Sequence, residues 1–407
     1  MTKTNYSCNS TKLMLVLPLP ILWNGESLFI DKQAYNGIHQ WLNNFNSVTI
    51  CMPQINISGI PTDTMRINDI DFEGRCRIVR LPNQRKAIPF FKSIFHTKKI
   101  LDQLIDESTH LCFAIGGLFG DWAAVAALCA NKKRRKAAIW TDRVESSVFA
   151  FTGKQSKGLR GIYWSIMALV TRHFERLVIK RSALGLFHGA DCFAAYAPYS
   201  KNPHLVHDIH LSKDMQITHD ELNIKIHRLE KLTIVYAGRV HPDKGPLEWI
   251  ECLKQLSLSG VEYKATWYGD GPQLHDARSM VKSAALEDKI IFIGKIEDHA
   301  ALMGHMRQAD LFIFCHKTLE SPRCLIESLM SGTPIVGYNS DYPADLIKVH
   351  SGGILTDSKP SELAEAIIIL SKDRGKLANL IKSAAADGAP FTDAHVFKHR
   401  SDLIKDI

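Results

Sequence analysis

Between residues 232 and 338, short runs of β-branched and aromatic residues alternate with segments whose apolar residues recur at helical spacing. The apolar runs are LTIVYAG, KATWYG, KIIFIG, LFIFC and PIVGY, at residues 232–238, 264–269, 289–294, 311–315 and 334–338. The clearest helical patterns lie between these runs, at residues 246–258 and 298–308. Because this alternation is typical of βαβ units, the sequence predicts a parallel, doubly wound sheet.

The first half of the chain repeats this rhythm less regularly. We expect strands at residues 12–17, 48–52, 75–81, 110–115, 137–141 and 192–195. We expect helices at residues 31–44, 90–106, 121–130 and 159–185. The fold class is therefore predicted to be α/β, with two Rossmann-like, doubly wound domains.

Length and local polarity predict the domain boundary. A chain of 407 residues is long for one domain and suits two. The most polar interval with the fewest strand signals is residues 212–230, and we place the linker there or slightly before it. We predict one domain at residues 1–210 and a second at 211–389, followed by an amphipathic helix at 390–407. A ligand cleft is expected between the two domains, at the carboxyl ends of the strands.

Composition excludes several classes of protein. The apolar fraction of 45% and the charged fraction of 23% are those of a globular protein. The nine cysteines are scattered singly, which indicates a reducing compartment without a disulfide framework or a structural zinc site. The apolar run at residues 13–22 is too short to cross a bilayer, so we interpret it as a buried strand rather than a signal peptide. We expect a cytoplasmic protein that is either soluble or peripheral at the inner face of the membrane.

Positive charge is concentrated in the first half. The net charge of +8 is not spread evenly, because residues 131–181 hold thirteen Lys and Arg against three acids. Such a cluster indicates an anionic partner. One interpretation is an anionic membrane surface, because aromatic and apolar residues are interspersed with the cations. The alternatives are a core-packed helix with a solvated basic face, and nucleic-acid binding, for which no recognition motif is present.

Two cations follow the strand at residues 232–238. Arg239 comes directly after Gly238, and Lys244 follows five residues later. A guanidinium fork and an ammonium group on one loop can neutralise a diphosphate. The alternative is a pair of solvated loop charges.

A glycine turn follows the strand at residues 264–269. Gly269, Gly271 and Pro272 belong to the sequence GDGP, in which glycines let the backbone pass close to a flat ligand such as a nucleobase. The same four residues also make a good generic turn, so this motif by itself is weak.

The strand at residues 311–315 is followed by the sequence ESPRCLIESLMSGTP. Ser321 is predicted to cap a helix that has Pro322 at its first position. Gly332 is predicted to end that helix. The motif therefore predicts a short helix that begins close to the carboxyl end of a buried strand.

The start of this helix has the chemistry of an anion and sugar site. Free amides near Arg323 and Cys324 would attract phosphate. Glu320, just outside the helix, can accept hydrogen bonds from sugar hydroxyls, and Glu327, inside it, can accept two from a ribose diol. The alternatives are an acid that favours the helix dipole for Glu320 and an exposed helix face for Glu327. Because these residues follow successive strands together with the cations and the glycine turn, we favour a single site.

These motifs together resemble the C-terminal domain of the GT-B glycosyltransferases of group 1, the retaining family 4. The resemblance is strong over residues 232–370 and diffuse in the first half. It implies that Arg239 and Lys244 hold the donor diphosphate, that Glu327 accepts hydrogen bonds from the ribose hydroxyls, and that Glu320 contacts the donor sugar. The GDGP turn and the amides at the helix start would also lie against the donor, and the terminal helix would cross back to the first domain.

The chain departs from the family pattern in three places. The family leaves seven residues between its two glutamates, whereas this chain leaves six. Gly25 is the nearest candidate for the Gly-Gly turn that the family often has near its first helix. Where the family often shows a His after the fifth strand, the chain has IWTDRVES, so Asp142 or Arg143 is the candidate for that work.

The resemblance implies a hexosyltransferase that uses a UDP- or GDP-sugar, retains the anomeric configuration, and needs neither metal nor cofactor. The cations and the helix start would stabilise the departing diphosphate, which can itself take the acceptor proton. A saccharide or lipid-linked acceptor is expected, in cell-surface polysaccharide or glycolipid assembly. The rival interpretations are an inactive binding subunit, a GT-B sugar-nucleotide epimerase, and a phosphorylase, which would need a longer chain with a pyridoxal-phosphate lysine.

Overall fold

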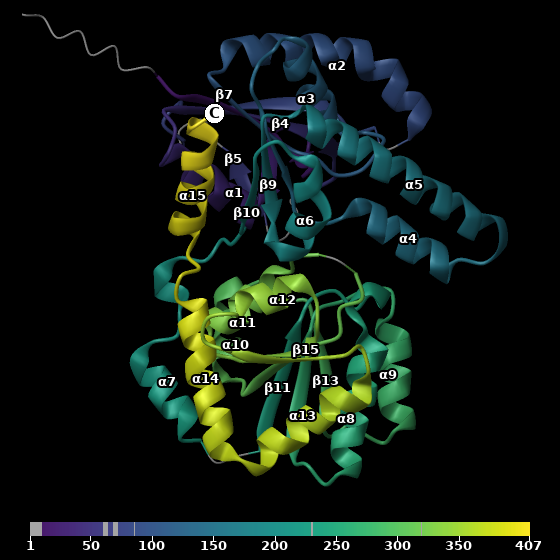
Figure 1. The fold of residues 1–407 in the computed structure, drawn as a ribbon, viewed down its shortest axis with the longest axis vertical. Coiled ribbons are helices and arrows are strands. Elements are labelled where there is room, and N and C mark those ends of the chain that lie inside the picture. The colour runs from purple at the N-terminus through teal and green to yellow at the C-terminus, as the bar shows by residue number, and fades with distance from the viewer. Residues whose placement is uncertain (1–9, 60–63, 68–71, 85, 229–230, 319) are drawn as a thin grey trace, which may run out of the picture. The chain divides into compact units, whose positions relative to one another are not determined.

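The computed structural model describes residues 10–407 except 60–63, 68–71, 85, 229–230 and 319. The chain forms two compact units, residues 1–210 with 396–407 and residues 211–395, which we call unit 1 and unit 2 and describe separately (Figure 1). The eight cysteines in the described part of the chain are free, and Cys8 lies outside it.

Unit 1 is built on a ten-stranded sheet in the order β10-β9-β8-β7-β1-β4-β2-β3-β5, with β6 also paired to β4. The pairs of β3 with β2 and with β5 are antiparallel, and the other pairs are parallel. The strands are β1 (Lys12–Val16), β2 (Ile21–Trp23), β3 (Leu28–Asp31), β4 (Ser47–Asn56), β5 (Thr64–Ile67), β6 (Cys76–Pro82), β7 (His110–Ala114), β8 (Ala138–Thr141), β9 (Leu184–His188) and β10 (Pro203–Val206). The helices are α1 (Lys32–Leu42), α2 (Ala87–Glu107), α3 (Trp122–Lys132), α4 (Glu145–Gln155), α5 (Gly158–Arg181) and α6 (Gly189–Tyr196).

The first apolar run of the sequence contributes the central strand of unit 1. Residues 13–16 in β1 are buried between β4 and β7, which confirms the predicted buried strand. The run does not continue as one strand, because Pro18 and Pro20 separate β1 from β2. Proline has no backbone N–H to give to a central strand, so the chain turns there.

The region around β9 corrects two predictions. Residues 192–195 were expected to form a strand but lie in α6, and β9 occupies the end of the segment predicted to be helical, 159–185. Gly189, with φ +75°, takes the chain directly from β9 into α6. A short apolar run fits a buried strand and a buried helix equally well, so periodicity could not separate them.

The helix α15 (Asp393–Lys405) is held on unit 1 by a buried arginine. Arg400 is fully buried, and its Nη2 lies 3.1 Å from Oδ1 of Asp208, which is also buried. The guanidinium lies over the rings of Trp41 and Phe397, at 5.1 and 4.2 Å from their centroids. An ion pair with aromatic faces on the same cation offsets part of the cost of burying the charge.

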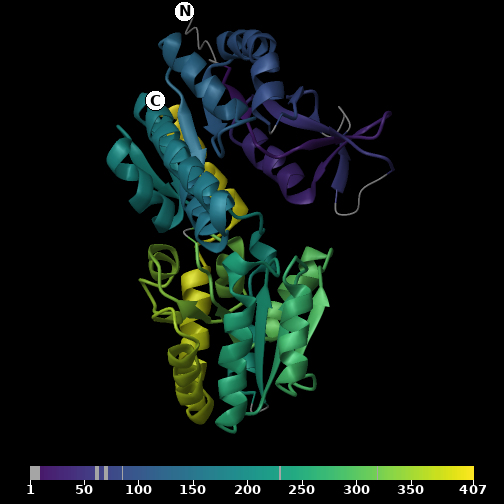
Figure 2. The ribbon, with the colours of Figure 1, turned by 90° about the vertical axis from the view of Figure 1, so that its right-hand side faces the viewer.

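Unit 2 contains a six-stranded, all-parallel sheet in the order β13-β12-β11-β14-β15-β16. The strands are β11 (Leu232–Ala237), β12 (Tyr263–Tyr268), β13 (Ile290–Gly294), β14 (Leu311–Phe314), β15 (Ile335–Tyr338) and β16 (Gly353–Thr356). The helices are α7 (His219–Ile226), α8 (Pro246–Leu258), α9 (Leu274–Ser283), α10 (His299–Gln308), α11 (Arg323–Met330), α12 (Asp341–Leu346), α13 (Pro360–Lys372) and α14 (Arg374–Gly388). The five strands predicted for this half are confirmed, and helices accompany the sheet in both views (Figures 1 and 2).

The sequence predicts a linker at residues 212–230 or slightly before them. The two units divide between residues 210 and 211, just before this interval, and the interval itself belongs to unit 2. Its polar residues build α7, which begins with a capping box formed by Thr218 and Glu221. Lys225 of this helix is buried, and its Nζ donates to Oγ1 of Thr333 at 2.6 Å. The interval is polar because it caps a helix and makes buried hydrogen bonds. Residues 229–230 lie outside the described part of the chain.

Candidate functional site

The strand order of unit 2 reverses between β11 and β14. Strands β12 and β13 extend the sheet on one side of β11, and β14 to β16 extend it on the other. In open parallel sheets, ligands bind at the carboxyl ends of the two strands where the order reverses. The cations predicted from sequence follow β11, and the sequence ESPRCLIES follows β14, so both lie at this position.

The loops behind β11 and β14 are packed directly against each other. Gly245 ends the first loop with φ +65°, and a Cβ at this position would lie 2.4 Å from the carbonyl oxygen of Cys315. The amide of Lys317 donates to the carbonyl of Asp243 at 2.8 Å. Only glycine permits both this φ and this approach, so the residue after Lys244 is dictated by the neighbouring loop.

Lys244 and Glu320, predicted from separate motifs, form an ion pair between Nζ and Oε1. Their side chains are 10% and 15% exposed, so the pair is largely shielded from water. Arg239 is exposed on the same loop as Lys244, and in the described part of the chain no carboxylate pairs with it. The loop therefore presents one neutralised and one unneutralised cation at the carboxyl end of β11.

The GDGP turn after β12 has its glycines for a structural reason. A Cβ at Gly269 would lie 2.0 Å from the carbonyl oxygen of Gly238, and one at Gly271 would lie 2.4 Å from that of Val240. The amide of Val240 in turn donates to the carbonyl of Asp270 at 2.9 Å. The turn is thus attached to the Arg239 loop, while contact with a nucleobase remains a prediction. Pro272 is exposed beside this turn.

The helix after β14 begins two residues later than Ser321. Pro322 stands at the cap position with φ −69° and ψ 122°, and α11 begins at Arg323, so the predicted cap at Ser321 is wrong. The extended ψ of Pro322 keeps Ser321 outside the helix, where it is buried. The predicted end is confirmed, because Gly332 has φ +59° and its amide donates to the carbonyl of Leu329 at 2.9 Å.

Glu327 lies on the buried side of α11 and is 6% exposed. The alternative of an exposed helix face is therefore wrong. Its Oε1 lies 3.1 Å from Nε2 of His299, the first residue of α10. Sequence analysis missed His299, although its position at the start of the helix that follows β13 places it at the same edge of the sheet.

Two further side chains next to the ion pair, the buried Tyr236 and the partly buried His316, were also missed. The hydroxyl of Tyr236, on β11, lies 2.7 Å from Nε2 of His316, behind β14. Burial, and then the charge of Lys244, hold the pKa of His316 well below its ordinary value, so the ring is neutral. Burial, and then the charge of Glu327, raise the pKa of the Cys324 thiol, so this cysteine is not a thiolate.

The two first-half candidates, Gly25 and Asp142, belong to unit 1. Gly25, the nearest candidate for a glycine turn near the first helix, has φ +100° and is exposed in the turn between the antiparallel strands β2 and β3. Asp142 is exposed directly behind β8. Arg143 pairs with Glu145 at 2.5 Å between Nε and Oε1, and Glu145 is buried at the start of α4.

Unit 1 also contains buried acids that the sequence did not reveal. Asp121 caps α3 and accepts hydrogen bonds from the amides of Ala124 and Gly116, at 2.8 and 3.0 Å. Burial raises the pKa of Asp121 to about 6. Burial, with a smaller contribution from the charge of Glu145, raises the pKa of Glu175 on α5 to about 7. These groups bind protons more tightly than exposed carboxylates do.

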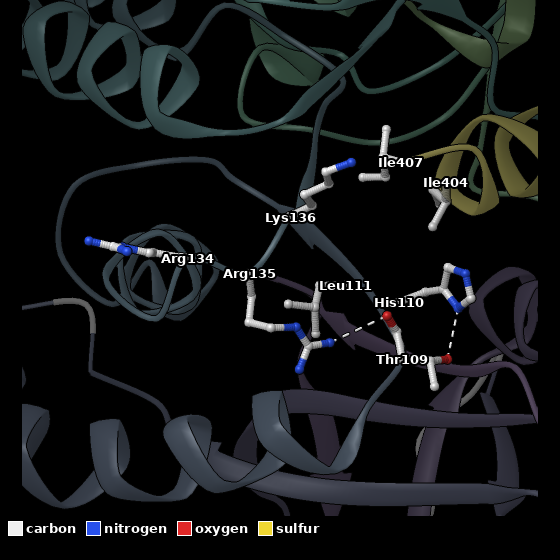
Figure 3. A pocket seen from close by; sticks show the side chains of 8 residues that line it. All are labelled: Thr109, His110, Leu111, Arg134, Arg135, Lys136, Ile404 and Ile407. Carbon is white, nitrogen blue, oxygen red and sulfur yellow. Dashed lines mark hydrogen bonds between the residues drawn. The ribbon is translucent and has the colours of Figure 1, made fainter.

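A cavity of about 270 Å³ lies in unit 1 at the amino ends of β7 and β8, opposite the carboxyl end of β8 that precedes Asp142 (Figure 3). Its basic wall consists of Arg134, Arg135 and Lys136, and Arg135 donates to the carbonyls of Ile105 and Ser108 at 2.7 and 2.6 Å. Arg135 thus stabilises the C-terminal end of α2. None of the predicted site residues lines this cavity.

The helices α4 and α5 pack side by side as a hairpin (Figure 1). One face of α5 exposes large apolar side chains to solvent, each 44–86% accessible: Leu159, Ile162, Tyr163, Ile166, Leu169 and Val170. We call these six residues the α5 stripe. Lys157, Arg160 and Arg172 are exposed on the same helix or just before it, whereas Val178 and Ile179 of α5 are buried. The helix is thus packed on one side and exposes cations on the other, as the core-packed alternative predicts, but it also exposes the apolar α5 stripe. Within the described residues, no helix is long and apolar enough to span a membrane.

Comparison with solved structures defines the fold class. The chain superposes on HepE from Anabaena, solved in complex with UDP, with a TM-score of 0.67, 13% identity, and coverage of 98% of this chain and 100% of that chain. At this identity the likeness shows the fold alone, which is GT-B.

The second unit matches a family model. Residues 219–387, which make up most of unit 2, match the family model of the glycosyl transferases group 1. The chain is 29% identical over 154 residues to 2-deoxystreptamine N-acetyl-D-glucosaminyltransferase of Niallia circulans, covering 37% of this chain and 39% of that protein. It is 31% identical over 136 residues to alpha-monoglucosyldiacylglycerol synthase of Streptococcus pneumoniae, covering 33% of this chain and 30% of that protein. Both matches span less than two-fifths of the relative's length.

Proposed function

We propose that this protein transfers a hexosyl group from a UDP- or GDP-sugar to a saccharide or lipid-linked acceptor, with retention and without a metal ion. The proposal rests on the ion pair between Lys244 and Glu320, which lies where the strand order of unit 2 reverses. Arg239 and the start of α11 follow the same two strands. Such a position is where parallel sheets bind nucleotides. The UDP named for the HepE complex favours uridine as the base.

The residues divide into a phosphate side and a nucleoside side. Arg239 and Lys244 would hold the diphosphate, together with the amides of residues 321–324. Glu327 would accept hydrogen bonds from the ribose hydroxyls, and Glu320 would contact the donor sugar. As the bond between the sugar and the diphosphate breaks, Lys244 faces two anions, the Glu320 carboxylate and the phosphate. The ion pair between Lys244 and Glu320 must then open, or Lys244 must contact both anions. Charge stabilisation of the leaving group is the main catalytic contribution in this scheme.

Proton transfer needs no strong protein base in this scheme. The leaving phosphate oxygen can take the proton of the acceptor hydroxyl as the new glycosidic bond forms on the same face. Asp142 is the proposed contribution of unit 1 to the reacting sugar, and Gly25 is retained only as a candidate for donor contact. Both assignments rest on the family resemblance.

The acceptor side is proposed to lie at an anionic membrane surface. The α5 stripe offers apolar side chains with cations beside them, which suits the boundary between headgroups and acyl chains. One relative is named as a synthase of a glycosylated diacylglycerol, which favours a lipid acceptor. The protein would then be cytoplasmic and peripheral, acting in glycolipid or polysaccharide assembly.

A binding and turnover experiment tests this function. Isothermal titration with UDP and GDP, followed by detection of released nucleoside diphosphate with a panel of sugar nucleotides, measures both steps. We expect binding of one diphosphate, acceptor-dependent release that persists in EDTA, and loss of binding in Arg239→Ala and Glu327→Ala. Binding without turnover would identify an inactive subunit, and conversion of the sugar nucleotide without an acceptor would identify an epimerase. Near-normal binding in both variants would refute the site.

A further inference from the structure

His299 lies against the carboxylate of Glu327 on the neighbouring helix. Its Nε2 is 3.1 Å from Oε1 of Glu327, and the two side chains are 28% and 8% exposed. α10 follows β13 and α11 follows β14, so both residues belong to the carboxyl edge of the unit 2 sheet. The contact therefore lies at the edge where the nucleotide is proposed to bind.

The chemistry of the pair sets the direction of the hydrogen bond. An ionised carboxylate only accepts, so Nε2 of His299 carries the proton. Residues 325–330 of α11 are all buried, which holds the backbone of Glu327 in place, and the imidazole then restricts the remaining side-chain torsions. With Oε1 engaged by the ring, Oε2 and the free lone pair of Oε1 keep a constant orientation. A carboxylate in a constant orientation is what simultaneous recognition of two adjacent hydroxyls needs.

We propose that His299 is a positioning residue for ribose: by holding Glu327, it sets the preference of the site for a ribonucleotide over the 2′-deoxy form. This rests on the proposed function, because it assumes that the donor nucleoside lies at Glu327. A 2′-deoxy ligand leaves an acceptor lone pair of the carboxylate unfilled in a site that is mostly dry, and that loss lowers affinity. A carboxylate released from His299 can rotate away, so the loss becomes smaller.

The test compares ribonucleotides with deoxyribonucleotides on the full chain. Dissociation constants of UDP, 2′-deoxy-UDP, GDP and 2′-deoxy-GDP are measured by titration calorimetry for wild type, His299→Ala and His299→Gln. We expect wild type to prefer the ribo form of its nucleotide by about tenfold or more. We expect His299→Ala to reduce that ratio about fivefold, and His299→Gln, whose amide N–H can donate, to keep most of it.

A matched control comes from the same helix. His305 is exposed and stacks on Tyr268, with ring centroids 5.2 Å apart, and among the described residues the hydrogen bond and ion pair of Glu327 are made with His299 instead. His305→Ala should leave the ratio unchanged. An unchanged ratio in His299→Ala, in a variant that still binds the diphosphate, would overturn the inference and leave the proposed function standing. A wild type that binds without preference for ribose would also overturn it.

Failure of the proposed function has a different signature. If wild type binds neither UDP nor GDP, the site assignment fails, and the inference about His299 fails with it. If His299→Gln loses discrimination as fully as His299→Ala while both variants melt at the wild-type temperature, the hydrogen-bond donor is not what matters. That result would also overturn the positioning role.

Discussion

Lys244 and Glu320 are 76 positions apart in the chain, and their ion pair joins the loops behind β11 and β14. Both side chains are mostly buried, so each charge depends on the other for compensation. A diphosphate placed here would meet a cation that already has a partner, beside an arginine that has none in the described part of the chain. The pair therefore links the stability of unit 2 to the binding of an anionic ligand.

The first prediction concerns this pair and its response to nucleotide. Lys244→Met and Glu320→Gln each leave one charge buried without its partner, so each should lower the free energy of unfolding by about 3 kcal/mol. Saturating UDP should raise the melting temperature of Glu320→Gln more than that of wild type, because the diphosphate replaces the missing negative charge. It should raise that of Lys244→Met less.

The control for this experiment is an exposed pair in the same unit. Lys231 and Glu262 pair at 2.9 Å with both side chains 61% exposed, so Lys231→Met should leave the free energy of unfolding close to that of wild type. Equal UDP-induced shifts in Lys244→Met and Glu320→Gln would contradict the proposed role of Lys244 at the phosphate.

The second prediction concerns pH and Glu175. Its pKa is raised to about 7 in the folded protein from an ordinary value of 4.5, so the folded state binds the proton more tightly than the unfolded state does. Stability from this group is complete below about pH 4.5 and is lost as pH rises toward 7. Wild type should therefore lose unfolding free energy between pH 5 and pH 8. Glu175→Gln, which stays neutral, should make that loss smaller by on the order of 3 kcal/mol.

Urea unfolding at several pH values measures this effect. The exposed acid Glu26 in the same unit provides the matched change, and Glu26→Gln should leave the pH dependence as in wild type. A wild-type profile that rises from pH 5 to pH 8 in parallel with that of Glu175→Gln would show that the folded protein does not hold this proton.

The third prediction concerns the anchor of α15. Arg400→Ala removes a fully buried cation from Asp208 and from the faces of Trp41 and Phe397. We expect unit 1 to lose about 3–5 kcal/mol of unfolding free energy, because Asp208 stays buried without this partner. Lys398→Ala on the same helix removes an exposed pair with Asp402 and should cost less than about 1 kcal/mol, so similar losses in urea unfolding would refute the anchor.

The fourth prediction concerns the α5 stripe and membranes. Sedimentation with vesicles that contain anionic lipid should deplete wild type from solution at low salt, and high salt should weaken this binding. Replacing Ile162 and Ile166, which are 58% and 56% exposed, by serine should lower the bound fraction at least about tenfold without loss of stability, because the removed side chains contribute apolar area only when bound. Leu258→Ser, an exposed apolar site in unit 2, is the control. Unchanged binding in the double variant would exclude the stripe as the contact.

The sequence was most informative in unit 2 because its strands are buried and parallel. Such strands are continuous apolar runs, and their carboxyl ends share one edge of the sheet. Arg239, Lys244 and Glu320 could therefore be assigned to one region before any contact was known. In unit 1 the antiparallel strands β2, β3 and β5 are short and lie toward one edge, and the pattern did not reveal them.

Some local signals had a cause that only neighbouring segments supplied. Gly269 and Gly271 predict a close approach to a flat ligand, and the structure adds a second reason for them, because the carbonyls of Gly238 and Val240 lie against them. The polar interval 212–230 suggested a linker, whereas Lys225 within it is buried on Thr333. The sequence shows that a residue is small or polar, but it does not show which distant residue packs against it.

The sequence by itself determined the alternation of strands and helices, the helix end at Gly332, and the concentration of site chemistry behind three strands, because these depend on residues within one or two turns of each other. The tertiary structure decided which of those residues touch. The pairs Lys244 with Glu320 and His299 with Glu327 exist because the sheet order reverses between β11 and β14, and because α10 packs beside α11. Local periodicity does not encode strand order, so these contacts could be found only in the folded chain.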